Sequence, residues 1–342
     1  MKELLTASRM ESMLTCPRRH YWRYECGLRR MESAAALRFG SAWHAGMEVR
    51  WRKGTAAEVF AAATAGGECD ELAVATLTAM LGAYYEVYRF DEVREIHPEV
   101  EFQHPIARSR TFQAAGKIDG LAVLDDGRLA LVEHKTTGMP IDPNAGYWLR
   151  LRANSQVYQY VMAARLLGWD ISTVIYDVAR KPSIKPKNIA APDADGLKTV
   201  LDDTTGERVF GKNGKPRQSA GAGMTLQTRP ETPEEYGERL HADCLARPEF
   251  YFARREVPVL DSDLEEFADL QVQVGRMIQD RRRQQKGLAE TPERAWPRHV
   301  SGMVCPGCEY VGFCLQNIIP RDEAPIGFEY SRIHEELEEA TK

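Results

Sequence analysis

The sequence predicts an α/β fold in which helices flank a central mixed sheet, and three observations lead to this prediction. Alanine-rich and amphipathic stretches dominate the first 95 residues. β-Branched runs separated by turn residues follow between residues 96 and 180, a pattern typical of strands. Long amphipathic stretches return after residue 233. A block of strands with helical sequence on both sides indicates a layered domain that packs helices on a sheet.

The 342 residues are enough for one large domain or two ordinary ones. We interpret residues 1–342 as a single domain with four parts. These are a helical part that carries the first cysteine of a cluster (1–95), a sheet core (96–180), an insertion or flexible loop (181–233), and C-terminal helices with the other cysteines of the cluster (234–342).

Composition and charge describe an ordinary globular protein, with 43% hydrophobic and 28% charged residues. There is no run of about 18 apolar residues and no apolar core of an export signal, so we expect a cytoplasmic protein without a membrane span. The net charge of −5 is not that of a strongly basic nucleic-acid binder. Local charge can differ, because arginines cluster early in the chain: Arg18, Arg19, Arg23, Arg29 and Arg30.

The N-terminal part is predicted to be helical. Ser8 and Glu11 fit a capping box, and Gly27 is a suitable end for the helix that follows. A second helix is expected from about Ser41, and the alanine-rich stretch 56–88 adds further helix.

The sheet core is predicted to contain four strands and one helix. The strands span 99–105, 111–124, 128–135 and 171–178, and the helix spans 146–167. Residues 181–233 are rich in Gly, Pro, Lys, Asp and Thr, which predicts a loop with a short hairpin near residues 211–214. Ordered sequence then resumes as a helix from Thr232, an edge strand at 256–260 and a long helix at 261–284.

The turn Asp125-Asp126-Gly127 sets the register of the central hairpin. A three-residue loop with glycine in the left-handed conformation places Leu124 opposite Arg128. Five pairs further along, Asp119 lies opposite Glu133. Directly opposed residues have Cβ atoms about 4.5–5.5 Å apart, so two carboxylates are predicted to face each other.

Lys135 completes this group. It lies two positions beyond Glu133 and shares its face, whereas the side chain of His134 points the other way. Facing carboxylates repel, and Mg²⁺ binds such groups while keeping positions for water and phosphate. With the lysine holding the attacking water, the group suffices to hydrolyse a phosphodiester. The hairpin alone leaves an ordinary surface ion pair as an equal alternative.

Three further side chains fit such a site if the fold brings them to it. Gln156 and Tyr160 are four residues apart, so they project from one helix face and can hydrogen-bond a phosphate or a water. His44 would favour Mn²⁺ or Fe²⁺ over Mg²⁺. Taken alone, each of these residues is more often structural.

Three cysteines near the end of the chain have the spacing of a metal site. Cys305, Cys308 and Cys314 form C-x2-C-x5-C and can converge on one centre. Zn²⁺ or a four-iron cluster needs a fourth ligand, and Cys16 is the best candidate. The site would then join the two ends of the chain. A zinc site with His299 as fourth ligand is the alternative, and spacing does not separate the two.

Taken in order, these segments resemble a known family. They are Leu14 to Arg19, Phe39 to His44, Gly116 to Gly120, Val132 to Thr137, Gln156 with Tyr160, and Cys305 to Cys314. Their order is similar to the RecB-like branch of the PD-(D/E)xK nucleases, and more narrowly to its iron–sulfur members. Those include the AddB-type nuclease domain and the small exonucleases attached to CRISPR adaptation modules. Many single-domain members are carried by phages, so a phage origin is also expected.

The resemblance implies a restriction-endonuclease-like core and a catalytic role for the hairpin. The implied ligands of Mg²⁺ or Mn²⁺ are His44, Asp119, Glu133 and the backbone carbonyl of His134. Lys135 would be the catalytic lysine. Ile118 stands before Asp119 where the family name has a proline, a departure that this branch tolerates.

The resemblance also implies roles for the remaining motifs. Gln156 and Tyr160 would match the family's Q-x3-Y motif, which helps to position DNA. Four cysteines would hold a structural [4Fe–4S] cluster, with zinc as the alternative: Cys16, Cys305, Cys308 and Cys314.

The implied function is that of a metal-dependent DNase, most simply an exonuclease on single-stranded DNA ends in recombination, repair or phage DNA processing. No G-x4-G-K-[ST] loop is present, so any unwinding must come from a helicase or recombination partner.

Two other functional classes stay open. One is a non-catalytic iron–sulfur or zinc module that binds nucleic acid. The other is a nuclease subunit that is active only inside a recombination or CRISPR-adaptation complex. The intact Asp119, Glu133 and Lys135 favour the active enzyme. The segment 181–233 is locally basic, which fits either phosphate contact or a solvated loop.

Overall fold

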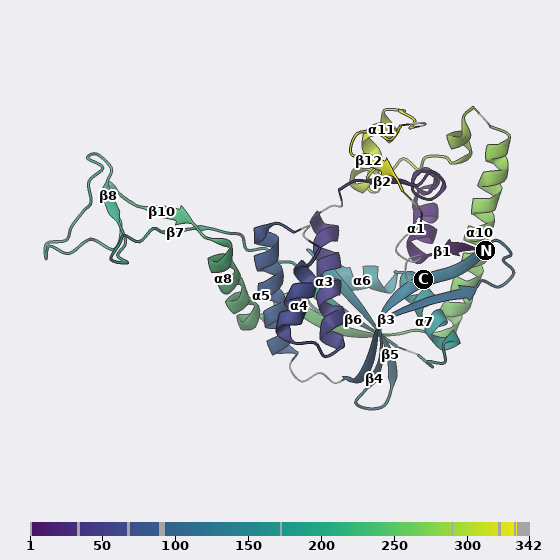
Figure 1. Cartoon of the computed structure of the whole chain (residues 1–342), viewed down its shortest axis with the longest axis horizontal. Coiled ribbons are helices and arrows are strands. Elements are labelled where there is room, and N and C mark those ends of the chain that lie inside the picture. The colour runs from purple at the N-terminus through teal and green to yellow at the C-terminus, as the bar shows by residue number, and fades with distance from the viewer. Residues whose placement is uncertain are drawn as a thin grey trace.

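A six-stranded mixed sheet forms the centre of the computed structural model (Figure 1). Its strands are β1 (Glu3–Leu5), β3 (Val93–Pro105), β4 (Phe112–Leu124), β5 (Leu129–Thr137), β6 (Thr173–Arg180) and β11 (Phe252–Pro258). Their order is β1, β4, β5, β6, β11, and β3 pairs with β4. β4 runs antiparallel to β3 and β5, whereas β5 and β6 are parallel. The predicted mixed sheet is therefore confirmed.

The structure describes residues 2–32, 35–66, 69–88, 93–171, 173–288, 290–320, 323–331 and 333. Residues 67 and 68, within the helical stretch predicted at 56–88, lie outside this part of the chain. Within it, no helix combines the length and the apolar character needed to cross a membrane.

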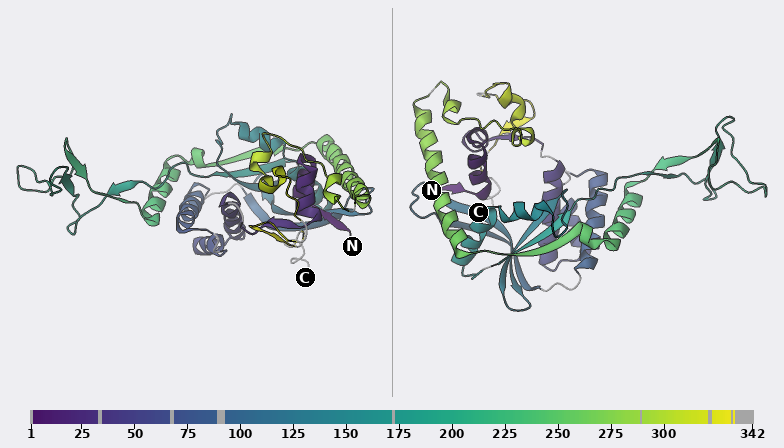
Figure 2. Two further views of the ribbon diagram at one scale, coloured as in Figure 1. Left: turned by 90° about the horizontal axis from the view of Figure 1, so that it is seen from above. Right: turned by 180° about the vertical axis from the view of Figure 1, so that it is seen from behind.

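Two sets of helices flank the sheet (Figure 2), and the two larger hydrophobic cores lie between these helices and the sheet. The helices are α1 (Ala7–Thr15), α2 (Pro17–His20), a π-helix (Tyr21–Glu25), α3 (Ala35–Trp51), α4 (Ala56–Thr64), α5 (Glu71–Val87), α6 (Gly146–Arg152), α7 (Gln156–Leu166), α8 (Pro233–Ala246), α9 (Pro248–Tyr251), α10 (Asp261–Lys286) and α11 (Val311–Leu315). Short 3₁₀ helices occupy Pro292–Ala295 and Cys305–Gly307. One core packs Val161 of α7 and Val274 of α10 against the sheet. The other joins α3, α4, α5 and α8 around Trp43 and Leu240.

The first helix begins two residues before the start predicted from Ser8. Thr6 is the N-cap of α1, and its hydroxyl accepts a hydrogen bond from the backbone N–H of Arg9 at 3.2 Å. The capping box predicted from Ser8 and Glu11 is therefore wrong, because threonine and serine are both good N-caps and the fold uses Thr6.

The helix predicted over 146–167 is interrupted and forms α6 and α7. The side-chain oxygen of Asn154 accepts a hydrogen bond from the backbone N–H of Gln156 at 3.0 Å, which starts a new helix there. Gly168 follows α7 with φ of +93°, as expected for a glycine at a helix end. The break places Gln156 in the first turn of α7.

Segments from near the two ends of the chain lie together at the top of Figure 1, where β2 and β12 are labelled. β2 (Leu28–Arg30) pairs antiparallel with β12 (Phe328–Tyr330). Arg18 donates hydrogen bonds to the carbonyls of Trp296 and Glu293 at 2.8 and 2.7 Å. Gly27 has φ of +73°, and a Cβ added there would lie 2.5 Å from the carbonyl oxygen of Ser331. Backbone pairing thus brings the N-terminal helices next to the C-terminal cysteine segment.

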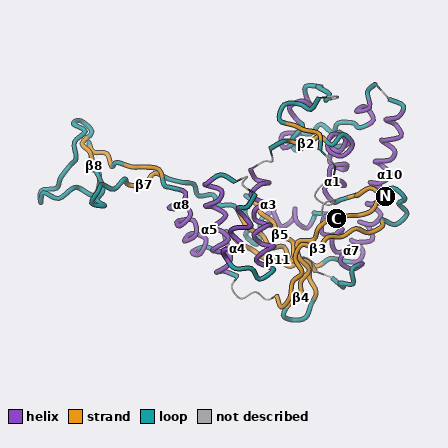
Figure 3. The backbone as a smooth tube through the Cα atoms, in the orientation of Figure 1, coloured by secondary structure: helices purple, strands orange, loops and turns teal. Residues whose placement is uncertain are grey.

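The segment predicted as an insertion or flexible loop forms an arm of short paired strands that projects from the body (Figure 3). β7 (Asn188–Ala190) pairs with β10 (Thr228–Pro230) at its base, and β8 (Val200–Asp202) pairs with β9 (Met224–Leu226) further out. The hairpin predicted near residues 211–214 is present, since the N–H of Gly211 donates to the carbonyl of Lys215 at 2.8 Å. The arm is therefore a structured projection.

Candidate active site

The central hairpin has the predicted register, and its carboxylates lie where the pairing ends. The last pair between β4 and β5 is Gly120 with Val132, so Asp119 and Glu133 occupy the next positions. The backbone N–H of His134 reaches across and donates to Asp119 Oδ2 at 2.8 Å. The two carboxylates therefore stand at a fork between the strands, where backbone pairing leaves room for side-chain chemistry.

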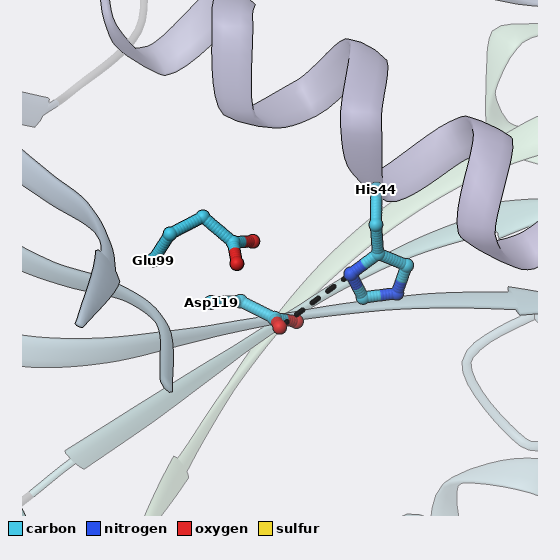
Figure 4. A group of neighbouring side chains, drawn as sticks. All are labelled: His44, Glu99 and Asp119. Atoms are coloured by element: carbon cyan, nitrogen blue, oxygen red, sulfur yellow. Dashed lines mark ion pairs between the residues drawn. The ribbon is translucent and has the colours of Figure 1, made fainter. Parts of the chain in front are cut away.

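One group of side chains at this fork can hold a metal ion. His44, Glu99 and Asp119 each offer a ligand atom, and these atoms lie within 4.8 Å of one another. His44 projects from the helix above, and the two carboxylates come from neighbouring strands (Figure 4). Nδ1 of His44 lies 3.4 Å from Oδ1 of Asp119. An imidazole with two carboxylates suits a divalent cation such as Mn²⁺.

Glu99 is a candidate ligand that sequence reasoning missed. It lies on β3 opposite Asp119, because its neighbours on both sides pair with the neighbours of Asp119. Its φ is +56°, a left-handed conformation that costs free energy in a non-glycine residue and often marks functional sites. Pairing the predicted strand 99–105 with 111–124 could have suggested this position. The backbone conformation at Glu99 has no signal in the sequence.

A chain of hydrogen bonds links the lysine to the helix motif. Lys135 Nζ donates to Glu133 Oε1 at 2.5 Å and to Gln156 Oε1 at 3.0 Å. Gln156 Nε2 in turn donates to the hydroxyl of Tyr160 at 2.8 Å. A Cβ added at Gly116 would lie 3.1 Å from the Tyr160 ring, so the glycine keeps space for that ring. The structure thus brings the predicted residues of β5 and α7 together.

Two of the three carboxylates at the fork, Glu99 and Glu133, have too little positive charge around them to offset their burial. Glu133 is 1% exposed, and within the described residues its Oε2 has no hydrogen-bond partner. Burial raises the pKa of Glu133 despite the nearby Lys135. Burial also raises the pKa of Glu99, although Lys117 forms an ion pair with it. Burial acts in the same direction on Asp119, but the hydrogen bond and charge of His44 outweigh it and hold the pKa of Asp119 below its usual value. A bound cation would supply the missing charge.

The side chain of His134 lies on the opposite side of β5, as predicted. Trp51 Nε1 donates to His134 Nε2 at 2.8 Å, and His134 Nδ1 lies 3.1 Å from Asp177 Oδ2. Both ring nitrogens are thereby engaged away from the fork. Metal binding by the backbone carbonyl of His134 stays a prediction.

A pocket of about 590 Å³ opens beside the fork. Its lining includes Lys117, Lys135, Arg150, Asn154 and Gln156. Lysine, arginine and amide side chains are the groups that most often contact phosphate oxygens of nucleic acids. A sugar–phosphate backbone lying in this pocket could therefore contact Lys135.

The four predicted cluster cysteines, Cys16, Cys305, Cys308 and Cys314, line one pocket. Backbone N–H groups of His299 and Ser301 point at the sulfurs of Cys16 and Cys305, at 3.5 and 3.4 Å. Among the residues that the structure places, no three cysteine sulfurs lie within 4.8 Å of one another. Tetrahedral zinc with four thiolates would need them about 3.8 Å apart. Nδ1 of His299 lies 3.1 Å from the carbonyl of Thr15.

The fold and the fork define a class: an α/β protein with a candidate metal centre where two strands of its central sheet separate. A family model described as the PD-(D/E)XK nuclease superfamily matches residues 4–315. The chain belongs to this superfamily of nucleases, which use divalent metal ions, and its sheet and flanking helices are consistent with the restriction-endonuclease-like fold.

Comparison with solved structures gives more distant similarities. The crystal structure of SSO0001 is 11% identical and covers 93% of this chain and 90% of its own, with a TM-score of 0.32. Protein VC1899 from Vibrio cholerae is 10% identical and covers 42% of this chain and 54% of its own, with a TM-score of 0.16. No curated protein matches the chain.

Proposed function

We propose that the protein is a metal-dependent deoxyribonuclease that acts as an exonuclease on single-stranded DNA ends, in recombination, repair or phage DNA processing. The observation that carries the proposal is the row of Glu99, Asp119 and Glu133 on three adjacent strands, with His44 and Lys135 beside it. Buried carboxylates short of positive charge, next to a lysine, are suited to metal-assisted phosphodiester hydrolysis. Membership of a nuclease superfamily supports the same activity.

The proposed metal ligands are His44, Asp119, Glu133, the carbonyl of His134 and, in addition, Glu99. A bound Mg²⁺ or Mn²⁺ would lower the pKa of a water molecule and polarise a phosphate oxygen. Lys135 holds the attacking water or stabilises the charge that develops on the phosphate. Its bonds to Glu133 and Gln156 fix the position of the ammonium group before the substrate arrives.

The DNA strand is proposed to enter through the pocket beside Lys135. Lys117 and Arg150 line this pocket and can contact the phosphates that flank the scissile bond. Gln156 and Tyr160 form one hydrogen-bonded unit on α7, so they can orient a phosphate or a water relative to the lysine. Their family role in positioning DNA agrees with this placement.

We further propose that Cys16, Cys305, Cys308 and Cys314 bind a structural [4Fe–4S] cluster. The shared pocket and the backbone N–H groups aimed at two of the sulfurs support this, since such donors are common around iron–sulfur clusters. The cluster would reinforce the junction that β2 and β12 already form.

A cleavage assay tests the enzyme. Wild-type protein and Lys135→Ala, both purified anaerobically, are incubated with end-labelled linear and with circular single-stranded DNA in Mg²⁺ or Mn²⁺. We expect metal-dependent shortening of the linear strand from its ends, intact circles, and no cleavage by the variant. Equal cutting of circles and linear strands would replace the exonuclease by an endonuclease. Metal-independent binding without any cleavage would establish a binding module instead.

The cluster is tested on the same preparation. We expect a brown protein that absorbs at about 400 nm and contains iron and sulfide in equal amounts. Cys308→Ser should lose the colour, whereas Cys69→Ser, at a cysteine outside the cysteine pocket, should keep it. A colourless protein that contains zinc would overturn the iron–sulfur proposal without affecting the cleavage result.

A further inference from the structure

The arm formed by residues 187–231 stands away from the body, yet its base is held firmly (Figure 1). Glu231 accepts two hydrogen bonds from Arg239 at 2.7 Å and one from the backbone N–H of Lys187 at 3.0 Å. Arg229 makes a second two-point contact with Glu235, at 2.6 Å for each bond. Bidentate arginine–carboxylate pairs are strong and directional. They connect the stem of the arm to α8, so the arm is presented in a defined direction.

Three acidic side chains of the outer arm bond to groups within the arm. Asp193 accepts bonds from two backbone N–H groups and pairs with Arg208 at 2.5 Å. Asp202 also accepts bonds from two backbone N–H groups, and Asp203 accepts a bond from the hydroxyl of Thr225 at 2.6 Å. These three carboxylates thus stabilise turns and pairs of the arm, whereas Asp195 and Glu207 are exposed.

The cations of the arm are arranged in the opposite way. Four are exposed and form no ion pair with any residue in the described ranges: Lys198, Lys212, Lys215 and Arg217. Three of these, Lys212, Lys215 and Arg217, belong to the hairpin that Phe210 and Pro216 close. Residues 208–230 contain no aspartate or glutamate. A chain with net charge −5 therefore carries a basic stretch without acids in this part of its arm.

We infer that this arm binds the phosphate backbone of double-stranded DNA next to the end that the active site processes, an inference that rests on the proposed function. Exposed cations without neighbouring acids bind a polyanion by displacing its counterions. Single strands are instead bound mainly by stacking on aromatic rings, and Phe210 is the only aromatic residue between residues 181 and 233. The composition therefore favours a duplex, contacted without regard to base sequence.

The test measures DNA binding at several salt concentrations in a Lys135→Ala background, which prevents cleavage. The substrates are a hairpin duplex with a single-stranded tail, and the tail alone. Lys212→Ala, Lys215→Ala and Arg217→Ala, combined, should weaken binding of the tailed duplex at least tenfold at low salt. The slope of log K against log salt should fall by about 2–3, since each lost phosphate contact removes about 0.9. Binding of the tail alone should not change.

Two further variants of the chain test whether the effect is specific to the arm. Arg276→Ala, Arg283→Ala and Lys286→Ala remove the same charge from α10, which lies at the end of the molecule opposite the arm (Figure 2), and should leave the slope unchanged. A deletion of residues 189–229, with Asn-Gly joining Asn188 to Pro230, should reproduce the loss. These two residues are partners in the stem, so a two-residue turn can join them.

The outcomes separate this inference from the proposed function. An unchanged slope in both arm variants, or an equal loss in the α10 variant, would overturn duplex binding by the arm. Cleavage by the wild-type protein would then still support the nuclease. Conversely, the wild-type protein could show no cleavage while only the arm variants lose duplex affinity. That result would overturn the nuclease proposal and support the arm inference.

Discussion

The fork in the sheet and the projecting arm carry opposite imbalances of charge. At the fork, three carboxylates share His44 and two lysines, and one carboxylate oxygen of the buried Glu133 has no partner among the described residues. In the arm, Lys212, Lys215 and Arg217 are exposed within residues 208–230, a stretch that contains no aspartate or glutamate. A buried deficit of positive charge suits a small cation, whereas an exposed excess suits a polyanion.

This comparison shows why the net charge of −5 is a poor guide to the partners of this chain. The net charge sums two regions of opposite local charge, the fork and the arm, which are separated by the length of the arm. Binding and chemistry are expected to depend on different regions, so variants in one should leave the other intact. The following predictions test that separation, and each compares groups whose surroundings differ.

The largest effect is expected from Glu133→Gln at the fork. Loss of one charged group that acts on the transition state typically costs on the order of 10³-fold in rate. The metal-free protein should keep most of its stability, because burial raises the pKa of Glu133 and one of its oxygens has no partner, which offsets the lost ion pair with Lys135. Single-turnover cleavage and thermal melting measure the two quantities. A loss of activity below tenfold would remove Glu133 from the metal site.

Asp177→Asn should instead destabilise the fold, although Asp177 is as deeply buried as Glu133. Burial alone would raise the pKa of Asp177, but Arg254, His134 and Tyr84 hold it well below its usual value. Breaking such a compensated buried group costs about 3 kcal/mol of unfolding free energy. Denaturant titration measures it, with Asp261→Asn as the control, because that exposed ion pair with Arg165 should cost under about 1 kcal/mol. Equal costs for the two variants would contradict this contrast.

The variant Glu99→Gln tests whether Glu99 is a metal ligand at the fork. If Glu99 binds the metal, the variant should need about 10–100 times more Mn²⁺ for half-maximal cleavage and approach wild-type rates at saturation. Glu101→Gln is the matched control, since Glu101 is exposed two residues further along β3. An unchanged requirement for Mn²⁺ would make Glu99 a partner of Lys117 only.

The smallest effect concerns the base of the arm and its dependence on pH. Hydrogen bonds from Arg239 and from the backbone N–H of Lys187 lower the pKa of Glu231 from 4.5 to about 2. A lowered pKa means that the stabilisation is complete above pH 4.5 and is lost as the pH falls towards 2. Glu231→Gln should therefore accelerate amide exchange in β7 and β10 at pH 7. The ratio of variant to wild-type exchange rates should approach one near pH 2. A ratio independent of pH would show that this carboxylate does not hold the stem.

Much of the site is encoded in local sequence. The turn Asp125-Asp126-Gly127 fixes the hairpin register because loop length and one left-handed glycine determine which residues pair, and the structure keeps that register. Helical spacing likewise places Gln156 and Tyr160 on one face of α7. Spacing and resemblance predict a cluster held by Cys16 and the three late cysteines; these line one pocket, and the cluster itself stays a prediction.

Other features were decided only by the tertiary structure. Glu99 becomes a candidate ligand through the pairing of β3 with β4 and a strained backbone, both of which depend on residues far along the chain. Composition alone predicts a loop for the arm. Its stem is held in place because Glu231 and Glu235 form ion pairs with Arg239 and Arg229 between the stem and α8. Spacing in the chain thus determined which groups are neighbours on one element. Packing between elements determined which charges are left without a partner, and the proposed activity depends on those charges.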